Sequence, residues 1–483
     1  MSLKRKAASG SIWISLTRTG INVIDFAVYA YLARILSLED FGLVGFCLLF
    51  VEFTNTIVTA GVNQNLVQRK AWSDAYASST MSFVLSMSFV LAGCLIFIGA
   101  PIANYAYSEV AAYVVASLAP ITIIMSLQVV VSGKLLRDFK NKQMGIGKLI
   151  ATIISAAVII LLAESGYGLW SLVIGRLVNA CLEFLLLSFI ARMRFSLRFN
   201  KADNEELLRF CLPLLWAAIL NFTNSKVSNI VTGLILGPAS FALLATAKKA
   251  EQIINQVTLS SINSMVVPSF SRVKEGLNIG ELYIKLVTLT ACIVLPLFMG
   301  LAAISDPFVT IAFGDKFAQS ATYMSISAFI MFPSVVAWFL PSLLISQAKT
   351  RDAFKLTVIS VVSNVLVAVT MIWFGISIML ISLVVVNFLI LPLRFKIVSK
   401  HIAISIRNLS ESLMLPFTCA LGMFFIIVTS KYFLYSYFSN SVFLLLALIL
   451  IGVVSYPMLA FIFFNRSTRL QIKEISGILS NKK

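Results

Sequence analysis

One apolar stretch of membrane length, residues 11–34, carries polar and ionisable side chains at helical spacing. Steps of three and four residues place six of them on one face of a helix: Ser11, Ser15, Arg18, Asn22, Asp25 and Tyr29. An arginine inside a bilayer costs about 2.5–3.5 kcal/mol on insertion scales, so its guanidinium requires water or a polar partner. Arg18 therefore either extends to a nearby interface or lines a polar cavity between helices, where it can bind an anion.

Further apolar stretches also contain ionisable groups, and these groups are nearly balanced in charge. The cations are Arg18, Arg176, Lys226, Lys248 and Lys249, and the acids are Asp25, Glu52, Glu183 and Glu251. Lys148 is left out because it lies close enough to a helix end to extend to the interface. The groups either neutralise one another, as Lys248 and Glu251 can at a spacing of three, or line a solvated cavity with a slight cationic excess.

A cationic cavity predicts a binding site for a phosphate-bearing substrate, since arginine and lysine bind phosphate strongly where the dielectric constant is low. The five cations are then the predicted substrate-binding residues. Four amides are expected to line the same cavity: Asn22, Asn63, Asn221 and Asn255. Asp25 and Glu52 are candidates for coupling to a proton or ion gradient, because the pKa of a buried carboxyl group changes with its surroundings.

The composition is that of an integral membrane protein. The chain has 483 residues, of which 59% are hydrophobic and 12% charged, and its mean hydropathy is +0.95. Soluble domains contain about 25% charged residues. The net charge of +18 does not indicate a nucleic-acid partner, because most Lys and Arg lie in short loops between apolar segments. We therefore predict an all-α membrane protein in contact with the lipid bilayer.

Residue usage also excludes several kinds of chemistry. The single histidine, His401, lies in a basic loop, and the six cysteines lie in or beside apolar segments without a CxxC pair. The predicted loops are too short to fold a catalytic domain. We expect no catalytic residues, no metal and no cofactor, and therefore a protein that is not an enzyme.

Apolar segments of about 20 residues predict about fourteen membrane-spanning helices. The predicted spans are 11–34, 41–66, 76–99, 109–133, 146–164, 168–190, 210–236, 239–267, 281–304, 318–346, 355–375, 377–398, 412–434 and 441–463. Eight segments on one side, both termini included, hold 29 of the 38 Lys and Arg, and the opposite loops hold one, Lys316. This asymmetry predicts that both termini are cytoplasmic. Lys4–Lys6 resemble the start of a signal peptide, but Arg18 and Asp25 interrupt its apolar region, so we expect an uncleaved first helix.

Two six-helix lobes are predicted, followed by two further helices. The mixed-charge segment 191–209 is interpreted as a cytoplasmic linker between an N-terminal lobe, 1–190, and a C-terminal lobe, 210–400. Residues 401–483 then form two extra helices and a basic tail. At an offset of 200 residues, Ile35-Leu36, Phe41, Leu43 and Asn63 recur as Ile235-Leu236, Phe241, Leu243 and Asn263. Six helices between the copies predict parallel pseudo-repeats with a substrate site at their interface.

Several short motifs occur in order along the chain. They are Leu32-Ala33-Arg34 with Phe41-Gly42-Leu43, Gly61 with Leu66-Val67-Gln68-Arg69-Lys70, Pro268-Ser269-Phe270-Ser271-Arg272, Phe313-Gly314-Asp315-Lys316-Phe317 and Gln347-Ala348-Lys349-Thr350-Arg351. In these motifs the chain resembles the polysaccharide transporters of the multidrug/oligosaccharidyl-lipid/polysaccharide exporter superfamily, which are oligosaccharide flippases of the Wzx type. The resemblance implies two six-helix lobes plus two helices. It also implies transfer of undecaprenyl-pyrophosphate-linked oligosaccharide units across the bacterial inner membrane, by alternating access, for exopolysaccharide, capsule or lipopolysaccharide synthesis.

The resemblance also suggests roles for particular residues. Related lipid II flippases hold the pyrophosphate with arginines of a central cavity, and Arg18 lies in the matching region of the first helix. Those relatives bind sodium at an acidic site on helices 7, 11 and 12, where this chain has Asn221, Asn364 and Asn387 and no carboxylate. The expected partners are the lipid-linked oligosaccharide, a proton or sodium ion, and the polysaccharide polymerase with its chain-length machinery. Aliphatic surfaces of the last two helices can accommodate a lipid tail.

Other functions share parts of this pattern. A drug or metabolite cation antiporter of the same superfamily has the same fold and differs in substrate chemistry. A membrane-embedded polysaccharide polymerase or ligase acts on the same lipid-linked sugars, but such enzymes generally need catalytic residues in sizeable outward loops, which here are short and nearly uncharged. A scaffold of the export complex without transport of its own is a further alternative.

Overall fold

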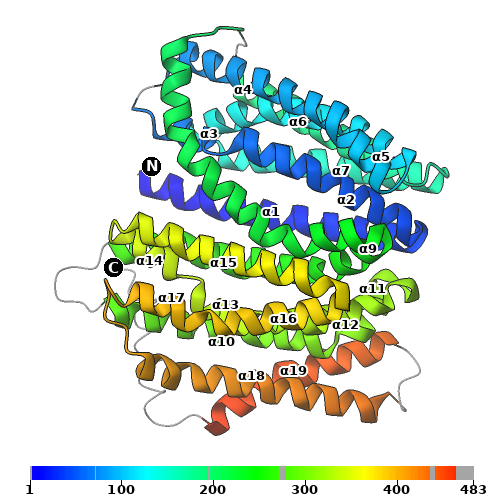
Figure 1. The fold of residues 1–483 in the computed structure, drawn as a ribbon, viewed down its shortest axis with the longest axis vertical. Coiled ribbons are helices and arrows are strands. Elements are labelled where there is room, and N and C mark those ends of the chain that lie inside the picture. The colour runs from blue at the N-terminus through cyan, green and yellow to red at the C-terminus, as the bar shows by residue number, and fades with distance from the viewer. Residues whose placement is uncertain (1–2, 71, 194–195, 272–278, 436–440, 464–483) are drawn as a thin grey trace. The chain divides into compact units, whose positions relative to one another are not determined.

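Helices make up almost all of the structure, a computed structural model that describes residues 3–463 apart from 71, 194–195, 272–278 and 436–440 (Figure 1). Twelve helical stretches in this part of the chain are long and apolar enough to cross a membrane. The stretch that begins at Lys201 holds two legs, and α1 adds a further helix that carries charges. The described residues thus contain the fourteen predicted helices, and the all-α fold class is confirmed.

The first half of the chain forms nine numbered helices. They are α1 (Leu3–Ile35), α2 (Leu38–Thr59), α3 (Val62–Gln68), α4 (Asp74–Cys94), α5 (Ala100–Ala106), α6 (Glu109–Arg137), α7 (Asn141–Glu164), α8 (Trp170–Ala191) and α9 (Lys201–Ser271). A π-helical turn, Leu95–Gly99, joins α4 to α5. Gly237, with a φ of 85°, separates the two legs of α9.

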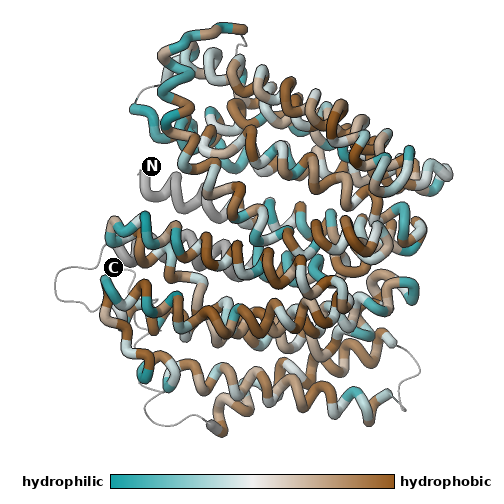
Figure 2. Tube along the Cα trace, in the orientation of Figure 1, coloured by the Kyte–Doolittle hydropathy of each residue, from teal (hydrophilic) through white to brown (hydrophobic). Residues whose placement is uncertain are grey.

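The second half forms the remaining helices. They are α10 (Ile279–Ala303), α11 (Ser305–Phe313), α12 (Ala318–Ala328), α13 (Met331–Ala337), α14 (Leu340–Ser346), α15 (Thr350–Met371), α16 (Ile376–Leu389), α17 (Leu391–Val398), α18 (Ile406–Leu434) and α19 (Ser441–Phe463). Figure 2 shows mainly hydrophobic residues along the long helices and hydrophilic residues near many of their ends. This is the distribution that a bilayer requires of spanning helices.

Local sequence explains where many helices begin and break. Serine side chains accept backbone hydrogen bonds at the start of four helices, α2, α4, α6 and α18: Ser37, Ser73, Ser108 and Ser405. Such a cap stabilises a helix by about 1 kcal/mol. Gly61, with a left-handed φ of 81°, separates α2 from α3. Pro341 and Pro392 lie in the first turns of α14 and α17, so the spans predicted at 318–346 and 377–398 are interrupted.

Three segments predicted as connections contain helix. Residues 305–317, expected to form an outward loop, include α11, and residues 99–108 include α5. Within the segment 191–209, α9 already begins at Lys201. Short connections near a membrane gain from helix formation because their backbone groups are then hydrogen-bonded internally.

The chain divides into two compact units, unit 1 of residues 1–245 and unit 2 of residues 246–483. In unit 1, α6 packs against α2, α3, α4, α5 and α8, while α1 packs mainly on α7 and α7 on α8. In unit 2, α10 packs against α12 and α18, α18 against α19, and α15 against α16. The lobes 1–190 and 210–400 remain a prediction, because these units follow packing and not the internal repeat.

Glycines allow close helix packing in unit 1. A Cβ atom on Gly145 of α7 would lie 2.5 Å from Thr17 Oγ1 of α1. A Cβ atom on Gly175 of α8 would lie 2.0 Å from Ile159 Cγ1 of α7. Small residues at such contacts are typical of membrane helices, whose association depends on van der Waals packing. The three helices α1, α7 and α8 are therefore held in a defined register.

Candidate functional site

The polar face of α1 carries an exposed arginine. Thr17 is 6% exposed and packs on α7, whereas the next residue, Arg18, is exposed. Asn22 and Asp25, one and two turns further along, are half-buried. Among the described residues of unit 1, no hydrogen bond or ion pair involves the side chains of Arg18 or Asp25. A guanidinium without a protein partner inside a membrane-length helix is a group that can bind an anion.

The first leg of α9 runs along α2 and joins two predicted site residues. Lys226 Nζ lies 2.7 Å from Glu52 Oε2. Near this pair, the rings of Phe222 and Phe53 have centroids 5.4 Å apart, and Asn221 is exposed. The ion pair neutralises one predicted substrate-binding cation and one predicted coupling carboxylate.

A second ion pair lies between α7 and α8. Lys148 Nζ is 2.6 Å from Glu183 Oε1, and the side chains are 34% and 13% exposed. Gln128 of α6 also donates to Glu183. The expectation that Lys148 extends to the interface is wrong, because α8 places a carboxylate opposite it. Arg176, two turns before Glu183 on α8, is exposed.

Asn63 is directed toward α6. A Cβ atom on Gly133 would lie 3.3 Å from Asn63 Oδ1. That oxygen is buried, and no hydrogen-bond donor reaches it in the described part of the chain. The structure therefore joins Glu52 with Lys226, and neither Asn63 nor Arg176 takes part in this ion pair.

Three predicted site residues of unit 2 lie on the second leg of α9. Lys248, Lys249 and Asn255 are half-buried. Glu251, which is 8% exposed, accepts a hydrogen bond from Ser327 Oγ and interacts electrostatically with Lys248. This arrangement agrees with the pairing that the spacing of three residues allows.

A buried arginine in unit 2 was missed by the sequence analysis. Arg394, which lies inside the predicted span 377–398 but is not among the predicted site residues, is 7% exposed. Its Nη2 donates to Ser360 Oγ at 2.8 Å and to Asn387 Oδ1 at 3.3 Å. Asn387 Nδ2 donates in turn to Asn364 Oδ1 at 2.9 Å and to the Leu383 carbonyl at 2.8 Å. Arg394 lies in α17, which continues the span beyond Pro392 and packs beside α15.

This network does not fit a sodium ion. Asn364 and Asn387 do lie together, as the resemblance implies for the sodium site. However, the oxygen of Asn387 already accepts from a guanidinium, and a second positive charge beside Arg394 is repelled unless a carboxylate compensates it. In the described part of unit 2, the Arg394 guanidinium donates to a serine hydroxyl and an amide oxygen, and neither acceptor is a carboxylate.

An apolar groove lies between α10, α18 and α19 of unit 2. It contains about 800 Å³ of empty space, part of which is open to the outside. Gly300 and Gly452 lie in its lining with Met423, Ile427 and Val453. The groove therefore has an apolar lining that suits a hydrocarbon chain.

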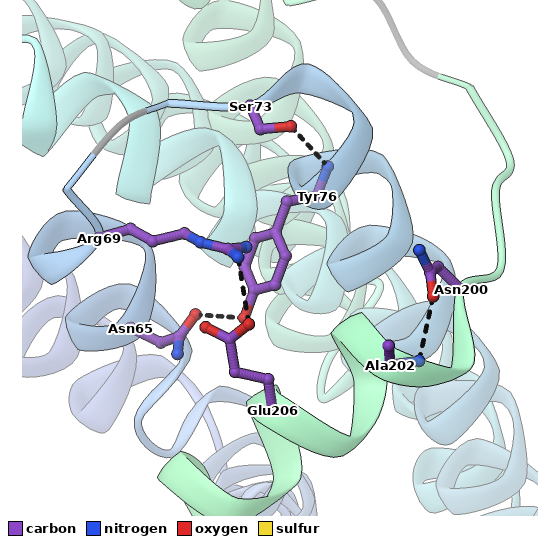
Figure 3. Close-up of polar contacts among 7 residues, drawn as sticks. All are labelled: Asn65, Arg69, Ser73, Tyr76, Asn200, Ala202 and Glu206. Atoms are coloured by element: carbon purple, nitrogen blue, oxygen red, sulfur yellow. Dashed lines mark hydrogen bonds and ion pairs between the residues drawn. The ribbon is translucent and has the colours of Figure 1, made fainter.

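A polar cluster fastens the start of α9 to α3 and α4 (Figure 3). Arg69 Nη2 lies 3.1 Å from Glu206 Oε2, and the guanidinium carbon is 3.3 Å from the centre of the Tyr76 ring. Tyr76 Oη donates to Asn65 Oδ1 at 2.8 Å. Ser79 of α4 adds contacts with the residues that begin α9. Spacing within one helix gives no signal for such contacts, and the sequence analysis did not find them.

Comparison with known proteins decides the family. Residues 31–322 match the family model described as polysaccharide biosynthesis protein, which is more than half of the chain. The chain belongs to this family. The predicted resemblance to the polysaccharide transporters is thereby confirmed.

Curated relatives of this family member include three named for polysaccharide biosynthesis. The succinoglycan biosynthesis transport protein ExoT of Rhizobium meliloti (strain 1021) is 26% identical over 312 residues, which are 64% of this chain and 63% of ExoT. The lipopolysaccharide biosynthesis protein WzxC of Escherichia coli (strain K12) is 25% identical, over 74% of this chain and 73% of WzxC. The teichuronic acid biosynthesis protein TuaB of Bacillus subtilis (strain 168) is 22% identical, over 68% and 69%. The chain thus spans less than two thirds of the length of ExoT, and more than two thirds of the lengths of WzxC and TuaB.

Solved structures confirm the fold. The lipid II flippase MurJ, in an inward closed conformation, matches with a TM-score of 0.77 and 15% identity, over 94% of this chain and 99% of MurJ. A multidrug resistance transporter of the MATE family, in an inward-facing conformation, matches with a TM-score of 0.53 and 15% identity, over 81% and 96%. This chain therefore has the fold that MurJ and the MATE transporter share.

Proposed function

We propose that this protein moves oligosaccharide units linked to undecaprenyl pyrophosphate across a bacterial inner membrane by alternating access. Relatives named for succinoglycan, lipopolysaccharide and teichuronic acid synthesis support a polysaccharide pathway. A lipid II flippase with the same fold along nearly the whole chain supports a lipid-linked substrate. The single observation that carries the proposal is Arg18, an exposed guanidinium on a spanning helix with no protein partner in the described part of unit 1.

Arg18 and Arg176 are proposed to bind the pyrophosphate first. Both are exposed within membrane-length helices, and a guanidinium binds phosphate oxygens through two parallel hydrogen bonds. Lys226 contributes by exchanging Glu52 for a phosphate oxygen, which keeps its charge compensated. Lys248 and Lys249 of unit 2 stay predicted substrate-binding cations, and exposed amides of unit 1 such as Asn221 are proposed to hydrogen-bond sugar hydroxyls.

The apolar groove of unit 2 is proposed to receive the lipid tail. Its lining from α10, α18 and α19 offers only hydrocarbon and sulfur atoms along most of its length. A polyisoprenyl chain that moves from the bilayer into this groove stays among hydrocarbon groups, so the move costs little. The polyisoprenyl chain therefore stays in an apolar environment while its charged head group crosses the bilayer.

Coupling is assigned to Asp25. Glu52 is held by Lys226, whereas Asp25 has no partner among the described residues of unit 1 and can bind a proton or ion during the cycle. We further propose that both termini are cytoplasmic, from the asymmetry of Lys and Arg, and that the polysaccharide polymerase and chain-length proteins receive the translocated unit.

One observation favours a second candidate, a drug or metabolite cation antiporter. The fold is also that of a multidrug resistance MATE transporter. An organic cation requires uncompensated carboxylates or aromatic faces in its site. Asp25 alone offers such a carboxylate on α1, against the exposed cations Arg18 and Arg176 of unit 1. The balance of charge favours an anionic substrate.

The test is transfer of fluorescent undecaprenyl-pyrophosphate-linked oligosaccharide between the leaflets of reconstituted liposomes. Arg18→Ala is expected to lower the rate at least about tenfold, because a charged hydrogen bond contributes about 1.5–3 kcal/mol. The matched control is Arg407→Ala, which removes an 87% exposed arginine at the start of α18. Equal rates for the two variants, or proton-driven uptake of organic cations without transfer of the lipid-linked sugar, would contradict the proposal.

A further inference from the structure

A second groove lies on unit 1, between the N-terminal end of α7 and the C-terminal end of α8. Its rim carries Lys140, Gln143 and Arg192, and its lining continues along the helices with Ile146, Ile150 and Phe189. About 880 Å³ of empty space, partly open to the outside, lies among these residues. The groove is separate from the ion pair of Lys148 with Glu183, since neither residue lines it.

The two cations are held at the rim by the backbone. Lys140 is the residue before α7, and its Nζ lies 3.5 Å from the Ile190 carbonyl oxygen at the end of α8. Arg192 ends α8 in a left-handed conformation with φ 49° and ψ 40°. Phe139, which precedes Lys140, also has a positive φ, of 56°. Residues with a Cβ rarely adopt this conformation, and such strain is concentrated at functional positions.

No acidic residue is among those that line the groove. Asp138 is nearby in sequence, but it is exposed and lies outside the lining. The positive charge of the rim is therefore not compensated within the groove. Below the rim, Phe189 is 83% and Ile150 is 41% exposed, so an apolar surface continues directly from the cationic one.

The apolar lining lies at the depth of the acyl chains when the rim lies at the membrane surface. Ile146 and Ile150 follow Lys140 by six and ten residues, which the helical rise converts to about 9 and 15 Å along α7. This is the depth that acyl chains occupy beneath a phosphate at the membrane surface, since half of the hydrocarbon core is about 15 Å thick. Gly147 forms part of the floor of the groove, where α8 packs so closely that a Cβ would lie 3.3 Å from Ile190 Cδ1.

We propose that this groove binds an anionic phospholipid, with its phosphate on Lys140 and Arg192 and an acyl chain along Ile146, Ile150 and Phe189. Basic pockets between spanning helices, on the side that the Lys and Arg asymmetry assigns to the cytoplasm, bind such head groups. The lipid neutralises the rim and covers the exposed apolar strip, so that it fastens the end of α7 to the end of α8. A free phosphate ion gains nothing from the apolar strip, which is why the groove is assigned to a lipid.

The test is native mass spectrometry of the purified full-length protein, titrated with phosphatidylglycerol. The double variant Lys140→Gln with Arg192→Asn removes both charges, and Asn tolerates the left-handed backbone at residue 192. Its affinity for phosphatidylglycerol is expected to fall roughly 25-fold, at about fivefold for each cation. The matched control is Lys142→Gln, since Lys142 lies over the Trp13 ring at 4.6 Å and does not line the groove. Its affinity is expected to stay unchanged.

Three further measurements make the result decisive. Phosphatidylcholine is expected to bind weakly to the wild type and to every variant. Glycerol 3-phosphate, which has the head-group charge without the chains, is expected not to compete with phosphatidylglycerol. Ile150→Ser leaves the rim intact and is expected to weaken phosphatidylglycerol binding alone. The proposal is overturned if the double variant and the Lys142 control bind phosphatidylglycerol equally, or if glycerol 3-phosphate displaces it. It is also overturned if the double variant loses only the lipid-linked oligosaccharide, because the groove is then part of the substrate path.

Discussion

Breaking the ion pair between α7 and α8 is the perturbation whose magnitude follows most directly from the structure. Lys148 and Glu183 are 2.6 Å apart, and Glu183 is only 13% exposed. Two unit charges at about 4 Å attract each other by about 4 kcal/mol at an effective dielectric constant of 20. Removing one partner of a fully buried pair costs about 3–5 kcal/mol. Because Lys148 is about a third exposed, we expect about 2 kcal/mol for each single variant.

A double-mutant cycle measures this pair. Glu183→Gln keeps an oxygen that accepts from Gln128, and Lys148→Met keeps most of the apolar stem. Each single variant is expected to lower the midpoint of thermal unfolding in detergent by roughly 4 °C, using about 2 °C per kcal/mol for a unit of this size. The double variant leaves no charge unpaired, so a coupling free energy of about 1–2 kcal/mol is expected.

The exposed pair Arg407 with Glu411 provides the matched control. Its atoms are 2.9 Å apart, but its side chains are 87% and 63% exposed. An exposed pair four residues apart on a helix couples by about 0.3–0.5 kcal/mol. Two results would refute a stabilising Lys148–Glu183 pair. One is a coupling free energy no larger than that of the control, and the other is an unchanged unfolding midpoint for Lys148→Met. Either result would mean that Lys148 extends to the interface.

Three further predictions concern packing, a cation and a hydrogen bond. Gly175→Ala is expected to lower stability by about 1–3 kcal/mol through the clash with Ile159, and stability close to that of the wild type would show that α7 and α8 can separate without cost. In a chain that carries Asp25→Asn, exchanging sodium for potassium is expected to leave thermal unfolding unchanged, because the Arg394 guanidinium already occupies the Asn387 oxygen that a metal would need; stabilisation by sodium alone would refute this. Tyr107→Phe removes the hydroxyl that donates to the Gly233 carbonyl and is expected to cost about 1 kcal/mol, whereas an unchanged unfolding midpoint would show that the bond contributes nothing.

The positions of the spanning helices follow from the sequence because the bilayer demands long apolar segments. Their interruptions are less predictable. The sequence predicts one helix over 41–66, but Gly61 interrupts it. The interruption depends on the left-handed φ of Gly61, which hydrophobicity does not reveal. Segment 305–313 forms a helix, although the sequence predicts a loop there. The prediction failed because the apolar run is too short to be recognised as a membrane-spanning helix.

The polar contacts depend on how neighbouring helices are rotated, which periodicity within one helix does not encode. Glu52 and Lys226 are both predicted site residues with separate roles, and the structure joins them. Lys148 was set aside because it lies near the end of a span, and Arg394 was not singled out. The structure gives each of them polar partners, from a neighbouring helix in both cases. The exposure of Arg18 agrees with its proposed role, and that role stays a prediction.

The boundary between the two units at residue 245 lies inside a helix, and this determines where the chain can be divided experimentally. A cut or insertion there interrupts backbone hydrogen bonds of α9 on both sides. The connection between α8 and α9 is a better position, because both resulting fragments keep complete helices. The first leg of α9 then belongs to the second fragment and still contacts α2 of the first through Lys226 and Phe222. Two coexpressed fragments therefore have a built-in means of reassembly, and the protein is suited to fragment complementation with a separate label on each part.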